Sequence, residues 1–89
     1  MATYLVESYA AGSAVDDQRA RARLAADRGT SVRYVRTTHL PGDETVLHVF
    51  EAESAEAVRE AARVAALPYE RIVEAVDGTA EPHEPEATE

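Results

Sequence analysis

The run from Val32 to Ala66 constrains the fold of this 89-residue chain more than any other part of it. Two segments rich in Val, Thr, Tyr and Phe, VRYVRTTHL and TVLHVFEAE, flank a Pro-Gly-Asp turn, a pattern typical of a β-hairpin. Ser54 then precedes an alanine-rich segment with apolar residues at helical spacing. We therefore predict strands over 32–40 and 45–51, followed by an amphipathic helix that Ser54 caps and that stops at Leu67-Pro68.

The flanking segments predict one more strand and helix before this unit and one strand after it. Residues 3–9 alternate aromatic and β-branched side chains with polar ones, as a half-buried strand does. Ser13 is a candidate N-cap for a helix that runs to Arg28, with Gly29 after its end. Residues 71–77 predict the last strand. The order β-α-β-β-α-β is that of an α+β ferredoxin-like domain, with an antiparallel sheet ordered 4-1-3-2 and both helices on one face.

Composition limits both the domain count and the class of function. We predict one domain over 1–78 and a disordered acidic tail over 79–89, where the residues TAEPHEPEATE offer no large apolar side chain. Seventeen acidic residues against nine arginines and no lysine give a net charge of −8, which disfavours nucleic acid as a partner. The absence of cysteine excludes disulfides and thiol catalysis. No apolar run is long enough for a membrane span and no signal peptide is recognised, so we expect a cytoplasmic protein.

Period-2 alternation predicts which side chains share a face of the sheet. One set, suited to lie under the helices, comprises Tyr4, Val6, Leu47, Val49, Val73 and Ala75. The other set lies on a face that nothing in the chain covers, and comprises Leu5, Glu7, Tyr9, Val46, His48, Phe50, Ile72, Glu74 and Val76. Such an apolar face predicts a homodimer. Glu74, Glu7 and His48 would form a row across it.

The partners of this row in strand 32–40 depend on the length of the hairpin loop. An odd number of loop residues brings Tyr34 and Arg36 beside His48, and an even number brings Val35 and Thr37, because a slip of one residue reverses every side chain.

The row has two chemical interpretations. Two carboxylates and an imidazole could hold a divalent metal ion, so Glu7, His48 and Glu74 are the candidate ligands, with Tyr34 and Arg36 as candidate binding residues for a small ligand. The alternative is a structural ion-pair cluster at the dimer interface, for example Glu7 with Arg36.

Part of the chain also resembles a known family. The segments YLVES, VRYVR and VFEAESAEAVREAARVAALPYERIVEAV are similar to a small bacterial family named for a nickel-binding member, over roughly Thr3 to Val76. The resemblance implies a ferredoxin-like fold, a homodimer of the α/β-barrel type packed through the open sheet face, and nickel as the cofactor of some members. Glu7 and Tyr34 match the family pattern. The chain departs from it at Arg36 and Leu67, where many relatives carry histidine.

Together these observations predict a dimeric ferredoxin-like protein that binds a metal ion, nickel or another divalent cation, or a small ligand at its open sheet face. An enzyme is the alternative. Cofactor-free monooxygenases and isomerases use the same dimeric barrel, and His48 would then be the base while Arg36 or Tyr34 orients an oxyanion. A pure interaction module without a ligand is a third possibility.

Overall fold

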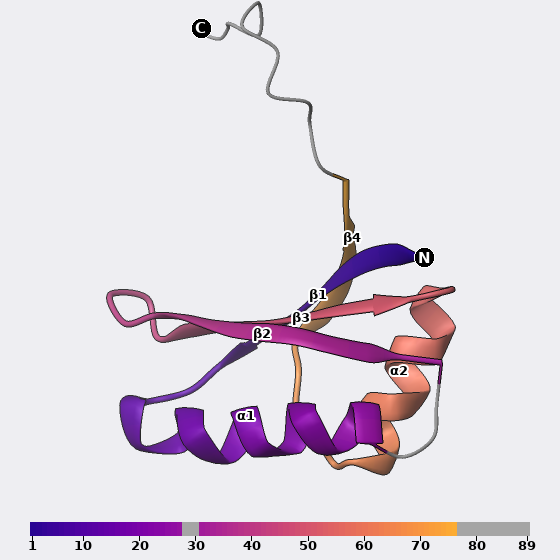
Figure 1. The fold of residues 1–89 in the computed structure, drawn as a ribbon. Coiled ribbons are helices and arrows are strands. Elements are labelled where there is room, and N and C mark those ends of the chain that lie inside the picture. The colour runs from indigo at the N-terminus through magenta and orange to yellow at the C-terminus, as the bar shows by residue number, and fades with distance from the viewer. Residues whose placement is uncertain (28–30, 77–89) are drawn as a thin grey trace, which may run out of the picture.

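The structure, a computed structural model, describes residues 1–27 and 31–76, and its elements follow the predicted order β-α-β-β-α-β (Figure 1). The strands are β1 (Ala2–Tyr9), β2 (Arg33–Leu40), β3 (Thr45–Ala52) and β4 (Arg71–Ala75). The helices are α1 (Gly12–Asp27) and α2 (Ala55–Val64).

The four strands form one antiparallel sheet in the order β2-β3-β1-β4, which is the predicted order 4-1-3-2 read from the other edge. Both helices lie on one side of this sheet (Figure 1). We call that side the covered face. No helix or strand of the described residues lies over the opposite side, which we call the open face. The ferredoxin-like fold predicted from the element order is confirmed.

The hydrophobic core lies between the sheet and the helices, and the two layers contribute side chains of different size. The helices bring mainly alanines, Ala22 and Ala25 from α1 and Ala61 and Ala62 from α2. The sheet brings the large side chains, among them Phe50, which is 1% exposed. Alanine side chains fill little of the space between the layers, so the aromatic side chains of the strands fill it instead.

The ends of α2 explain why this helix is well predicted. The Ser54 Oγ accepts a hydrogen bond from the backbone N–H of Ala57 at 3.2 Å, which confirms Ser54 as the N-cap. At the other end Ala66 has a φ of 57°, and the N–H of the buried Leu67 donates to the carbonyl of Ala62 at 2.9 Å. This left-handed residue closes the helix ahead of Pro68.

Several predicted boundaries shift by one or two residues. The helix α1 begins at Gly12, one residue before the predicted cap Ser13. The strand β4 ends at Ala75 rather than at residue 77, and Asp77 itself lies outside the described residues. Arg28, Gly29 and the predicted tail over 79–89 also lie outside them, so the tail stays a prediction. Among the described helices, none combines the length and the apolarity that a membrane crossing needs.

Candidate functional site

Strand pairing determines which side chains share a face of the sheet. Val6 pairs with His48 and Tyr4 with Phe50, and residues directly opposite in antiparallel strands point to the same face. Tyr4, Val6 and Phe50 all belong to the core under the helices. His48 therefore lies on the covered face, where it is 0% exposed, and its predicted position on the open face is wrong.

The face prediction is right for β1 but wrong for β3 and β4. In β1, Tyr4 and Val6 do lie under the helices. In β4, Val73 pairs with Leu5 and therefore lies on the open face. The strand β3 is apolar on both faces, with Val46 and Phe50 on one and Leu47 and Val49 on the other. Alternation alone could therefore not fix its phase, that is, which of these two sets faces the helices.

The predicted metal row is not assembled, because Glu7 lies on the opposite face of the sheet from His48 and Glu74. Glu7 lies on the open face, where the Nε of Arg71 donates to its carboxylate at 2.5 Å. His48 lies on the covered face. Glu74 pairs with Tyr4 on the covered side of the edge strand and is exposed. Within 1–27 and 31–76, no three His, Cys, Asp or Glu side chains are grouped so that they could hold a metal ion.

A β-bulge separates the two residues predicted to bind a ligand. The register between β2 and β3 shifts between Tyr34 and Arg36, so that Tyr34 pairs with Phe50 while Arg36 pairs with Val49. Tyr34 lies on the covered face, with its ring 5.8 Å from that of Phe50 in an edge-on contact. Arg36 lies on the open face. The four-residue turn 41–44 corresponds to the even loop, which correctly places Thr37 beside His48, but the bulge at Val35 splits Tyr34 from Arg36.

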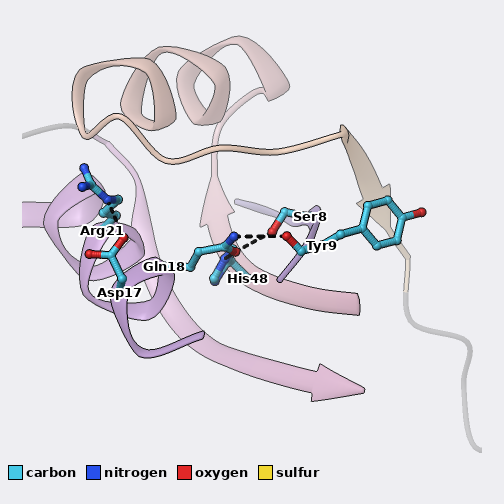
Figure 2. Close-up of polar contacts among 6 residues, drawn as sticks. All are labelled: Ser8, Tyr9, Asp17, Gln18, Arg21 and His48. Atoms are coloured by element: carbon cyan, nitrogen blue, oxygen red, sulfur yellow. Dashed lines mark hydrogen bonds and ion pairs between the residues drawn. The ribbon is translucent and has the colours of Figure 1, made fainter. Parts of the chain in front are cut away.

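A buried polar network surrounds His48 under α1. Gln18, on α1 and 6% exposed, lies between His48 and the end of β1 (Figure 2). Its Oε1 is 3.2 Å from His48 Nε2 and 2.5 Å from Ser8 Oγ, and its Nε2 donates to the carbonyl of Tyr9 at 3.4 Å. On the other side of the ring, His48 Nδ1 is 2.9 Å from Thr37 Oγ1, which is 2.7 Å from the hydroxyl of Tyr34.

The donors in this network follow from the chemistry of Gln18. An amide oxygen only accepts hydrogen bonds, so Ser8 and His48 Nε2–H both donate to it. Nδ1 of the neutral ring then accepts from the Thr37 hydroxyl, which accepts from Tyr34. Burial lowers the pKa of His48 to about 4, because the imidazolium ion loses its hydration. His48 is therefore a neutral structural side chain with both ring nitrogens occupied.

This arrangement bears on the enzymatic alternative as well. A catalytic pair of His48 and Arg36 would need both side chains in one cavity, and they lie on opposite faces of the sheet. The sequence contained one signal for the network that we missed. Gln18 precedes Ala22 and Ala25 at i, i+4 and i+7, so it is a polar residue on the buried stripe of its helix.

A cleft of about 510 Å³ borders the network, between α1 and the segment after α2. Gln18 lines it, together with Leu67 and Pro68. The charges at its edge compensate each other, because Arg21 Nε donates to Asp17 at 3.0 Å (Figure 2). This cleft therefore presents no unbalanced charge to a ligand.

The open face carries a hollow of about 360 Å³ that draws on all four strands. Its apolar lining comes from Leu5, Val35, Val49 and Ala75, and its polar lining from Thr3, Arg36 and Glu51. Both Val35 and Arg36 line it although they are consecutive, which is the consequence of the bulge in β2. Of the predicted site residues, only Arg36 lies in this hollow.

The charges on the open face are unevenly paired. Arg33 Nη1 donates to Glu51 at 2.5 Å, and Arg71 donates to Glu7 at the same distance. Both carboxylates therefore already have a cation. Among the described residues Arg36 has no ion-pair partner, which makes it the unbalanced charge of the hollow.

Comparisons with known proteins match the chain to a family and to a solved structure. Residues 4–75 match the family model of the nickel responsive protein SCO4226-like. The crystal structure of SCO4226 from Streptomyces coelicolor A3(2) superposes with a TM-score of 0.68 at 22% identity, and the match covers 88% of this chain and 100% of that one. No curated protein matches. At this identity the structural likeness shows the fold alone, whereas the family model spans most of the chain, and the chain therefore belongs to the SCO4226-like family.

Proposed function

We propose that this chain is a homodimeric binding protein in which two copies meet through their open faces and enclose a small organic ligand. The observation that carries the proposal is the open face itself. It presents Leu5, Val35, Val49 and Ala75 around a hollow of about 360 Å³, a volume within the usual range of ligand sites, and Val73 lies on the same face. A second copy would remove this apolar surface from water and close the hollow.

The size of the domain and its charges support a second copy as the cover. A chain of this length buries only about 60% of the surface that it exposes when unfolded, so a dimer adds core that the monomer lacks. The open face carries both signs of charge, in the pairs Glu7–Arg71 and Glu51–Arg33. In a two-fold interface the same patch meets itself, and a surface of mixed sign can do so without net repulsion.

A metal ion does not fit the described donors. The family description names nickel responsive proteins, and nickel accepts imidazole and carboxylate ligands. Here the described carboxylates of the open face are held by arginines, and His48 uses both ring nitrogens under α1. An organic ligand fits the apolar hollow better than a cation does.

Light scattering on the full chain and on two matched variants tests this proposal. Val73 on the open face and Leu24 on α1 are similarly exposed, at 37% and 40%. We expect Val73→Arg to lower the mass from that of a dimer to that of a monomer, and Leu24→Arg to leave the dimer intact. A dimer that persists in Val73→Arg but not in Leu24→Arg would place the interface on the helices and contradict the proposal.

Calorimetric titration of the full chain, without a histidine tag, with nickel tests whether His48 is a metal ligand. We expect His48→Gln to leave any heat of nickel binding unchanged, because the imidazole is enclosed by Gln18 and Thr37. A saturable nickel signal that His48→Gln removes would restore a metal site at this residue.

A further inference from the structure

We propose that the hollow on the open face binds an organic monocarboxylate with a short apolar tail, and that Arg36 holds its carboxylate. The inference rests on the proposed function, in which a second copy closes the hollow. The residues that line the hollow indicate the chemical class of the ligand.

The bulge in β2 brings two unlike side chains to the hollow. Strict alternation would place Val35 and Arg36 on opposite faces, but the register shift between Tyr34 and Arg36 lets both line the hollow. Bulges re-aim side chains in this way and are frequent next to binding sites. An apolar side chain and a guanidinium group are thereby brought side by side at one wall of the hollow.

The charges of the open face leave one arginine of the hollow without an ion pair among the described residues. Glu51 lines the hollow but is bound by Arg33, and Glu7 is bound by Arg71. Arg36 has no carboxylate of its own among the described residues. A guanidinium group pairs with a carboxylate through two parallel N–H···O bonds, and its attraction strengthens when water is excluded, as it would be beneath a second copy.

The remaining residues of the lining indicate what the part of the ligand away from its carboxylate is made of. Leu5, Val49 and Ala75 line the hollow with apolar side chains, and Val49 is only 4% exposed. Thr3 adds a hydroxyl to the lining. Such a lining favours an apolar group, and because Glu51 is already paired with Arg33, Arg36 leaves one positive charge for one negative charge of the ligand. These features select a monocarboxylate with an apolar body and not a phosphate or a dicarboxylate.

The alternative ion-pair partner of Arg36 is a carboxylate of the second copy. Arg36 would then be an interface residue, and the hollow would be filled by the partner. This alternative predicts that loss of the guanidinium weakens the dimer, whereas the ligand hypothesis predicts that it weakens ligand binding and leaves the dimer in place.

The test titrates the ¹⁵N-labelled full chain with benzoate and with benzamide, its neutral counterpart of the same shape, and records amide shifts and mass in parallel. We expect saturable shifts at Val35, Arg36 and Val49 with benzoate, and binding of benzamide weaker by about tenfold or more. Arg36→Gln should weaken benzoate binding by about tenfold or more. Arg36→Lys should weaken it by less, because lysine keeps the positive charge but cannot form the two parallel hydrogen bonds of a guanidinium group. The matched control Arg59→Gln, on the surface of α2, should stay within about twofold of the parent, as expected for an exposed ion pair.

The outcomes separate this inference from the proposed function. A dimer that binds neither probe, binds both equally, or binds benzoate unchanged in Arg36→Gln overturns the inference and leaves the dimer standing. Loss of the dimer in Arg36→Gln also overturns it, because the guanidinium then serves the second copy. A parent protein that is a monomer overturns the proposed function, whatever benzoate does.

Discussion

At the scale of single residues, His48 shows how a chemically versatile side chain can be made structural. Its ring is enclosed, with Gln18 accepting from one nitrogen and Thr37 donating to the other. A buried polar network that is fully satisfied favours one packing arrangement, because any shift leaves a donor or acceptor without a partner. The cost of this solution is a strong preference for the neutral ring.

That preference predicts a dependence of stability on pH. The pKa of His48 is about 4 in the folded protein against 6.5 for an unperturbed histidine, so the unfolded chain binds more protons between these values. The contribution of His48 to the free energy of unfolding is therefore complete above about pH 6.5 and is lost as the pH falls toward 4. We expect a loss of about 2 kcal/mol between pH 7.5 and pH 5 from this residue.

Urea unfolding of the parent and of His48→Gln at both pH values measures this loss. The variant cannot titrate at position 48, so its free energy of unfolding should fall less than that of the parent by about this amount. Equal losses in the two proteins would show that His48 is accessible to protons in the folded state.

At the scale of elements, α2 and β3 mark the two extremes of what the sequence could predict. The helix α2 carries an N-cap and an apolar stripe that were both recognised, whereas it ends at Val64, three residues before the predicted stop at Leu67-Pro68. The strand β3 is buried almost throughout, so its alternation contained no information about which side faces the helices. Its phase is set by tertiary packing, since the alanine-rich helices leave room for Phe50 on the covered face.

The same limit explains the error in the candidate site. The wrong phase of β3 moved His48 to the open face beside Glu7. The bulge at Val35, for which no glycine or proline gives a signal, places Tyr34 and Arg36 on opposite faces, whereas strict alternation puts them on the same face. Glu7 and Arg36 do share the open face, but for Arg36 two errors cancel: an odd loop would place it on the face of His48, and His48 itself was assigned to the wrong face. Element order survives such errors because it depends on turns and caps, whereas a site depends on the face of each strand.

The N-cap of α2 offers a prediction at this scale. Replacing Ser54 by Ala removes the acceptor for the N–H of Ala57 and should cost about 1 kcal/mol of the free energy of unfolding. Ser54→Asp keeps an acceptor at the same position and should stay close to the parent protein. Chemical unfolding curves of both variants decide the point, and an Ala variant as stable as the Asp variant would show that the cap contributes little.

At the scale of the whole molecule, the two faces of the sheet have different tasks. The covered face holds the core and the His48 network, so its residues serve stability. The open face combines apolar side chains, paired charges and one arginine without a partner among the described residues, and we assign binding to it.

The proposed function depends most directly on contact between two open faces. This contact can be measured directly in a sample that mixes isotope-labelled and unlabelled copies of the full chain, by recording nuclear Overhauser effects between them. We predict intermolecular contacts from the methyl groups of Leu5, Val35 and Val73, all on the open face. Contacts from Leu24 and Val64 on the helices instead, or no intermolecular contacts at all, would contradict the proposed function.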